Sequence, residues 1–191
     1  METIVSRYTT AAFNSLPDFE INKQRANEKV ELMNEFGIVL RKHKVERFLG
    51  IALVHKHFPL ETNERVVEEV RSEASYIQPR IVADETIITP YLWCVSANGG
   101  AKITWTPMEF VLSSSLVPSV RSFASELPSR FELLNELGEV LILNDAQDIF
   151  GLALLHRQRI QLDQSKQVLL ETGGSTTVSY THLTLPTKRI V

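Results

Sequence analysis

The side chains best suited to chemistry stand together in one short stretch, the His-Lys-His-Phe sequence that begins at His55, followed by Glu61. If this stretch is extended, His55 and His57 point to the same side, about 7 Å apart, because the chain rises ~3.3 Å per residue. That separation suits two ligands of one metal ion, and a glutamate is a suitable third ligand. His156 ends a similar apolar stretch and is a fourth candidate. The sequence therefore offers one candidate metal centre, formed by His55, His57, Glu61 and His156.

The pattern Gly50-x4-His55-x-His57-x3-Glu61 resembles the first metal-binding motif of the cupins. The resemblance covers 12 residues, its glycine spacing is one residue short, and the partner motif with a downstream histidine is absent. It implies that two histidines and a glutamate hold one divalent metal ion. The function implied is that of a metal-dependent enzyme in which the ion activates water or oxygen.

The alternative is that these histidines are structural. A histidine at the end of an apolar strand is ordinarily packed, with one ring nitrogen hydrogen-bonded. Where a second copy of this stretch occurs, His156 is retained, but Gln158 and Leu162 stand where His57 and Glu61 would be. Retention of the histidine without its co-ligands favours a packing role. The sequence identifies no catalytic residue and no cofactor-binding residue, and a divalent metal ion is the only cofactor it suggests.

The composition excludes several classes of protein. In the 191 residues, 20 basic and 23 acidic side chains leave a net charge of −3, which gives no long-range attraction to nucleic acid or to an anionic membrane. The single cysteine, Cys94, excludes an intramolecular disulfide framework, and we expect it to be buried. No apolar run approaches a membrane span, and the N-terminus lacks a signal-peptide core. We therefore expect a soluble intracellular protein, cytoplasmic or nuclear. The sequence identifies no particular partner, and a protein partner is possible.

An internal repeat organises the chain. A shift of 101 positions gives 11 identities within the 25 positions from 31 to 55, without a gap. The identical positions in the first copy are Glu31, Leu32, Asn34, Glu35, Gly37, Val39, Leu40, Gly50, Ala52, Leu53 and His55. Two copies of a unit predict a duplicated domain with pseudo-two-fold packing, since a solenoid needs more copies at a shorter period.

Each copy, about 28–72 and 129–173, is predicted to contain one helix and two strands. An apolar helix face is formed by Val30, Met33, Gly37 and Leu40 in the first copy, and by Phe131, Leu134, Gly138 and Leu141 in the second. The shared glycines suggest close backbone approach or helix ends. Core strands follow at 48–55 and 149–156, and each is expected to form a hairpin with a second strand, at 64–70 and 166–172. The Gly/Ala face of each core strand is expected to lie against the repeat helix.

Between the copies the pattern predicts three strands and a helix. The strands are 76–84, 90–98 and 102–112, with a hairpin turn at Asn98-Gly99-Gly100, and the helix begins at Pro118. The acidic run Glu68, Glu69 and Glu73 is interpreted as a solvated surface. Trp93, Trp105 and Phe110 are assigned to the core, and residues 1–22 to the periphery. The predicted fold is a single compact α+β domain over 1–177.

The last residues, 178–191, resemble a sequencing adapter translated in one frame, because ten of them read VSYTHLTLPT. On this interpretation the tail is not native and the natural chain is interrupted near Thr177. The HKHF, PYLW, W-x-P-x-E-F and FGLALLH segments, which span roughly Leu32 to Leu170, resemble a group of fungal proteins with no assigned activity. We therefore expect a non-enzymatic protein with a binding or auxiliary role, and a cupin-like, metal-dependent enzyme is the alternative.

Overall fold

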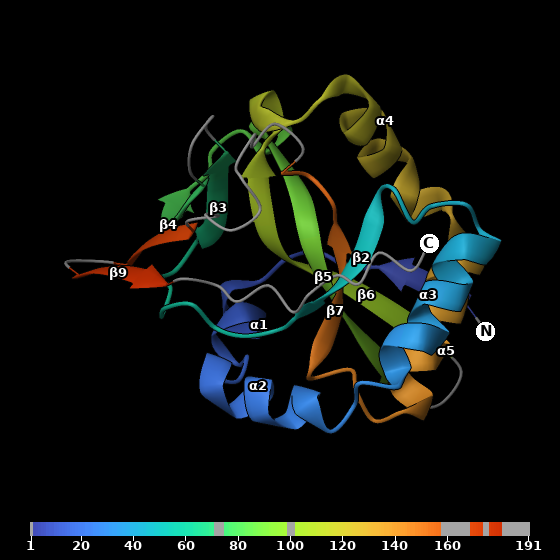
Figure 1. Cartoon of the computed structure of the whole chain (residues 1–191). Coiled ribbons are helices and arrows are strands. Elements are labelled where there is room, and N and C mark those ends of the chain that lie inside the picture. The colour runs from blue at the N-terminus through green and yellow to red at the C-terminus, as the bar shows by residue number, and fades with distance from the viewer. Residues whose placement is uncertain (1, 71–74, 99–101, 158–168, 174–175, 181–191) are drawn as a thin grey trace.

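A computed structural model describes residues 2–70, 75–98, 102–157, 169–173 and 176–180 (Figure 1). They form one α+β domain in which helices cover a mixed, open sheet. Seven strands make up the main part of the sheet: β1 (Glu2–Val5), β2 (Leu49–Leu53), β3 (Glu64–Val70), β4 (Ser75–Ile81), β5 (Ile88–Asn98), β6 (Lys102–Leu112) and β7 (Phe150–Leu154). Their order is β2-β7-β5-β6-β3-β4, and β1 lies parallel to β6. β8 (Leu169–Gly173) and β9 (Thr176–Tyr180) extend the sheet beyond β4.

The described residues contain five α-helices: α1 (Thr10–Asn14), α2 (Phe19–Asn27), α3 (Leu32–Lys42), α4 (Pro118–Glu126) and α5 (Phe131–Leu143). α3 and α5 lie side by side on one side of the sheet (Figure 1). They run antiparallel: Lys42 at the end of α3 pairs with Glu136 in the first half of α5, and Asn144, just after α5, bonds to Glu35 in the first turn of α3. α4 begins at Pro118 as predicted, where the missing N–H of proline costs the helix no hydrogen bond. No helix among these residues is both long and apolar enough to cross a membrane.

The buried faces of α3 and α5 differ from the predicted ones. α3 buries Leu32, Phe36 and Leu40, whereas Val30 precedes the helix and is 62% exposed. Phe131, its counterpart in α5, is 59% exposed. Val30 lies before α3 and Phe131 is the first residue of α5, so no preceding turn of helix covers either side chain. The predicted apolar face of each helix therefore begins one residue too early.

The two helix glycines have different surroundings. A Cβ on Gly138 would lie 2.7 Å from a methyl group of Ile103, so this glycine lets α5 approach the sheet closely. A Cβ on Gly37 would meet only the side chain of Arg41. The predicted close approach therefore applies to the second helix and not to the first.

The individual strands are predicted well, but two of the pairings are wrong. β3 and β6 have the expected bounds, and the β5–β6 hairpin is confirmed, with its glycines outside the described residues. The predicted β2–β3 hairpin does not form: β2 pairs with β7, and β3 with β4 and β6. Only part of the predicted strand at 166–172 is described, as β8, which pairs with β4 and not with β7.

The predicted contact between the small-residue face of β2 and β7 and a helix is also corrected. A Cβ on Gly50 would meet only the side chain of Leu155 within 4 Å. A Cβ on Gly151 would first meet the carbonyl oxygen of Trp93 and then Val54. The small residues therefore accommodate neighbouring strand segments. The opposite face, which carries Phe150 and two leucines of β7, is deeply buried.

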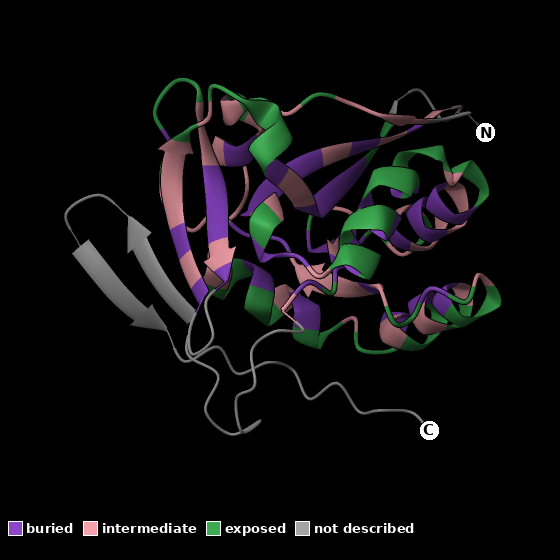
Figure 2. Cartoon of the chain, turned by 90° about the horizontal axis from the view of Figure 1, so that it is seen from above, coloured by how far each residue is buried: buried purple, intermediate pink, exposed green. Residues whose placement is uncertain are grey.

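The N-terminal segment is integral to the core, contrary to expectation. Phe13 and Asn22 are both fully buried, and β1 pairs with β6. The Asn22 side-chain amide donates to the carbonyl oxygens of Val54 and Asp148, at 2.7 and 2.6 Å, which ties the end of β2 to the turn before β7. Burial extends through both the sheet and the paired helices (Figure 2). As predicted, Trp93, Trp105, Phe110 and Cys94 are buried.

Of the tail, residues 178–180 belong to β9 and pair with β8, and residues 181–191 lie outside the described residues.

Candidate functional site

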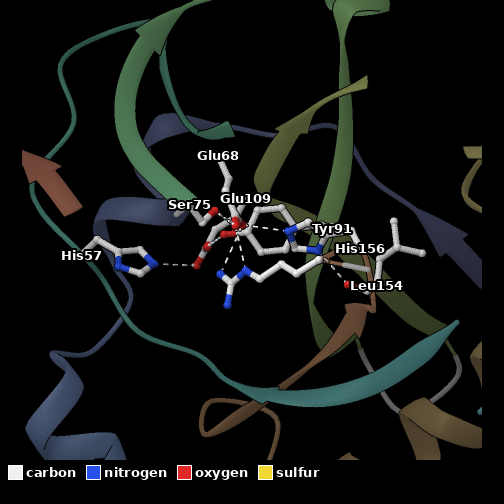
Figure 3. Close-up of polar contacts among 8 residues, drawn as sticks. His57, Glu68, Ser75, Tyr91, Glu109, Leu154 and His156 are labelled. Atoms are coloured by element: carbon white, nitrogen blue, oxygen red, sulfur yellow. Dashed lines mark hydrogen bonds and ion pairs between the residues drawn. The ribbon is translucent and has the colours of Figure 1, made fainter. Parts of the chain in front are cut away.

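Two carboxylates lie inside the domain, Glu68 on β3 and Glu109 on β6. Their exposed fractions are 0% and 3%. β3 and β6 are neighbouring parallel strands, with Val66 opposite Glu109 in the register. The two acids therefore lie close together, and Figure 3 shows histidine, tyrosine and arginine side chains converging on them.

Glu68 is enclosed by protein hydrogen-bond donors. Its Oε1 accepts from the hydroxyl of Ser75 and from Nε of Arg157, the latter at 2.7 Å. Its Oε2 lies 2.8 Å from Nε2 of His156 and accepts from Nη2 of Arg157 at 3.2 Å. Arg157 thus binds both oxygens, the bidentate geometry that gives guanidinium–carboxylate pairs their strength. Both oxygens of Glu68 are satisfied within the chain.

Glu109 is held by two different side chains. Its Oε1 lies 3.2 Å from Nε2 of His57, and its Oε2 accepts a hydrogen bond from the hydroxyl of Tyr91. The Tyr91 ring also packs against the ring of His156, with centroids 4.4 Å apart. Tyr91 therefore links the Glu109 group to the Glu68 group. We call these residues the buried polar network: His55, His57, Glu68, Ser75, Tyr91, Glu109, His156 and Arg157.

The histidines after β2 and β7 share one local arrangement. Nδ1 of His55 lies 3.3 Å from the carbonyl oxygen of Leu53, and Nδ1 of His156 lies 2.8 Å from that of Leu154. This contact orients each ring and leaves Nε2 directed elsewhere. For His156, Nε2 faces the Glu68 carboxylate, so each ring nitrogen lies beside an acceptor oxygen. His55 packs against the rings of Phe19 and His57, with centroids 5.0 and 4.3 Å away.

The charges of the network stabilise one another. Burial alone would raise the pKa of Glu68, but the adjacent Arg157 and His156 hold it well below its usual value. Burial likewise opposes ionisation of Glu109, yet His57, with smaller contributions from His55 and Tyr91, lowers its pKa. Both acids are therefore carboxylates near neutral pH.

Two further groups in this region are kept neutral. Burial and the nearby charge of Glu109 raise the pKa of Tyr91, which remains a hydroxyl donor. Burial raises the pKa of the Cys94 thiol, so it is not a thiolate nucleophile. The arrangement can hold an ordered set of charges inside the fold, but each carboxylate oxygen already has a protein donor.

The structure brings together three of the four residues predicted as metal ligands in this network. His55, His57 and His156 all belong to it, and the His55 and His57 rings are closer than an extended strand would place them. Glu61 is exposed in the turn before β3, where its backbone N–H donates to the Glu64 carboxylate. In the part of the chain that the structure describes, no three His, Cys, Asp or Glu side chains form a group that could hold a metal ion. The metal centre stays a prediction.

Sequence reasoning missed the acidic half of the network. The predicted solvated surface is wrong for Glu68, which is fully buried, and Glu73 lies outside the described residues. A signal was present: Glu68 alternates with Val66 and Val70, and Glu109 stands between Met108 and Phe110 in an apolar strand. A lone carboxylate among strand residues that face a core predicts a buried partner of opposite charge.

Comparison of this chain with protein-family models, with curated proteins and with solved structures found no match in any of the three.

Proposed function

We propose that this chain is a non-enzymatic α+β protein that acts through contacts of its surface with a partner or a small ligand. The observation that carries the proposal is the enclosure of the buried polar network. Glu68 and Glu109 are almost completely buried, and each of their oxygens has a hydrogen-bond partner within the chain. A carboxylate that is buried to this extent presents almost no surface to solvent with which to receive a substrate or an ion.

The energetics of buried charges support a structural role for the network. Moving a carboxylate out of water costs several kcal/mol, and the cost is offset only where the geometry is good and the remaining hydrogen bonds are made. Here, a bidentate arginine, a histidine and a hydroxyl compensate Glu68. Such a network joins β3, the segment after β7 and the strand β5 into one unit. Its function on this proposal is to hold the fold that presents the surface.

We also infer that the two helix-strand units are copies related by a pseudo-two-fold axis. Lys44 and Asp145, which are 101 positions apart, both have positive φ values, 56° and 49°. Residues with side chains adopt this backbone conformation infrequently, so its recurrence at equivalent positions supports a common origin.

The contacts between the two units are reciprocal as well. His43 lies 3.3 Å from the carboxylate of Glu136, and Asn144 donates to the carboxylate of Glu35 at 3.1 Å. Since His43 and Asn144 are equivalent under the shift of 101, as are Glu35 and Glu136, each contact is the image of the other. A rotation about one axis between the helices would produce this exchange.

The alternative function is a metal-dependent enzyme that uses His55, His57 and Glu61. The observation that favours it is the proximity of the two imidazole rings, 4.3 Å between centroids. Against it, Glu61 is exposed and its backbone N–H bonds to the nearby Glu64 carboxylate, and Nε2 of His57 faces Glu109. We therefore rank it second.

The metal content of the purified protein distinguishes the two functions. We expect well below one equivalent of zinc, iron, manganese or nickel by elemental analysis, and no change in the melting temperature on chelation. One equivalent of metal that is lost in the His55→Ala/His57→Ala double variant, but kept in His43→Ala, would favour the enzyme. Because Glu61 is exposed, Glu61→Gln is a further variant that should remain folded, and loss of metal from it would point the same way.

A further inference from the structure

The free edge of β2 carries an inference that goes beyond the proposed function. β2 is the last strand at one end of the sheet order, and among the described strands only β7 pairs with it. Figure 1 shows β2 running beside β7 at this end of the sheet. A strand edge presents unpaired backbone groups to which another strand can bind.

The register determines which groups are unpaired. The N–H of Val54 donates to Ile149, and the carbonyl oxygen of Phe48 accepts from Leu155. Residues of an antiparallel pair alternate between hydrogen-bonded and non-hydrogen-bonded positions, so even-numbered residues of β2 direct their backbone groups to β7. Ile51 therefore directs its N–H and its carbonyl group away from β7, toward the open edge.

The equivalent groups on β7 are in use. Leu152, which lies opposite Ile51, directs its N–H and carbonyl group to β5, where Trp93 is its partner. Among the strands that the structure describes, β7 thus has a neighbour on both edges and β2 has one on a single edge. β7 binds β5 through the edge that carries Leu152, and the open edge of β2 carries Ile51, the residue opposite Leu152.

We propose that β2 of a second copy of this chain occupies the open edge, antiparallel and centred on Ile51, so that one sheet continues through a symmetric dimer. The argument is the fit of β2 to its own sequence. Within the chain, β2 already pairs with the similar strand β7, with Gly50 opposite Ala153 and Ala52 opposite Gly151. In a pair centred on Ile51, Gly50 again faces an alanine, Ala52 of the second copy, and large side chains again face large ones.

The hydrogen bonds of such a pair are complementary. Ile51 exchanges two bonds with Ile51 of the second copy, and the N–H of Leu53 donates to the carbonyl oxygen of Leu49 on each side. The other two backbone groups that face this edge, the N–H of Leu49 and the carbonyl oxygen of Leu53, already have partners within the chain. The Leu49 N–H donates to Val45, and the Leu53 carbonyl oxygen lies 3.3 Å from Nδ1 of His55. The edge therefore offers donors and acceptors in matching positions.

The composition of the edge agrees with use by a partner strand. Proteins protect exposed edges with charged residues, proline or bulges, and the five residues of β2 include none of these. Beyond Leu53, the N–H of Lys56 is bonded to the carbonyl oxygen of Pro17, so the open stretch is short. A short interface predicts a dimer that dissociates on dilution.

The test is hydrogen exchange of the full-length protein by NMR, combined with sedimentation over a range of concentrations. We expect the Ile51 amide to exchange at least about tenfold more slowly at the concentration at which the dimer forms than in dilute solution. The Leu49 amide is an internal control, because its partner, Val45, is in the same chain and its protection should not depend on concentration.

Variants separate this edge from other surfaces. Ile51→Pro removes the N–H that faces the edge and should give a monomer, whereas Ile38→Lys, on the exposed side of α3, should leave the dimer intact. Should Ile51→Pro fail to fold, the exchange experiment on the unaltered protein still decides. The proposal would be overturned if the protein is a monomer at every concentration. This holds also if the edge of β2 binds a strand from another protein instead. A dimer that Ile38→Lys abolishes, or one in which the Ile51 amide gains no protection, would overturn it as well.

Discussion

Nε2 of His156 lies 2.8 Å from Oε2 of Glu68, although the two residues are 88 positions apart in the chain. The contact joins the segment after β7 to β3, and β7 and β3 are not neighbours in the sheet. Arg157 reinforces it by binding both oxygens of the same carboxylate. The stability of the domain should therefore depend on the charge of Glu68.

Glu68→Gln keeps the size of the side chain and removes its charge. We expect a loss of about 2–4 kcal/mol in the free energy of unfolding, because the buried side of Arg157 and the His156 ring lose their compensating charge. The measurement is urea unfolding at neutral pH. Glu69→Gln is the matched control: Glu69 pairs with Arg80 at 3.0 Å in a partly exposed position, so its loss should cost less than about 1 kcal/mol. Equal losses in the two variants would contradict a special role for Glu68.

Stability should fall as the solution is acidified. The pKa values of Glu68 and Glu109 are lower in the folded chain than their ordinary value of 4.5, so below that pH the unfolded chain binds more protons than the folded one. The stabilisation is complete above pH 4.5 and is lost progressively as the pH falls toward the folded pKa values. Urea midpoints measured between pH 7 and pH 3 test this. The Glu68→Gln/Glu109→Gln variant should be less stable at neutral pH and show a flatter acid limb, and an unchanged slope would refute the assignment.

The two strand glycines should differ in their tolerance of a methyl group. In Gly151→Ala, the new Cβ would lie 2.5 Å from the backbone oxygen of Trp93, which cannot move without shifting β5. In Gly50→Ala, the nearest atom is Cδ2 of Leu155 at 3.2 Å, at the end of a flexible and partly exposed side chain. We expect Gly151→Ala to cost about 1–3 kcal/mol and Gly50→Ala less than about 1 kcal/mol. Thermal unfolding of the two variants measures the difference, and the reverse ranking would contradict the packing described.

Removal of the Asn22 amide should destabilise the fold. Asn22→Ala leaves the carbonyl oxygens of Val54 and Asp148 without their donor in a buried position, at an expected cost of about 1–3 kcal/mol. Asn34→Ala, at an exposed position of α3, should change stability by less than about 0.5 kcal/mol. Chemical unfolding of both variants is the measurement. If Asn22→Ala were as mild as Asn34→Ala, the N-terminal segment would be peripheral after all.

Local elements were predictable from the sequence because they depend on local patterns. The alternating residues of β6, the proline at the start of α4 and the apolar periodicity of α5 each identify an element without knowledge of its neighbours. The α+β class and the burial of Trp93 and Trp105 follow from the same patterns. The 101-residue offset predicts that β2 and β7 are corresponding strands, and this correspondence stays a prediction.

Pairing was not predictable in the same way. Hairpins between consecutive strands were expected because short connections make them probable, but β2 lies beside β7, about 100 positions away in the chain. An apolar strand carries little information about which edge it will bind, since backbone hydrogen bonds are the same at every residue. The choice of partner depends on how all the strands and helices bury their faces together.

The buried polar network shows the same division between local and tertiary information. The sequence by itself determined that His55 and His156 end similar apolar stretches, and each ring contacts the carbonyl oxygen two residues before it. Only the tertiary structure decided that His156 meets Glu68 and that His57 meets Glu109. The physical reason is that a buried charge is stable only beside a compensating group. That group can come from any segment which the fold brings within about 3 Å, whatever its distance along the chain.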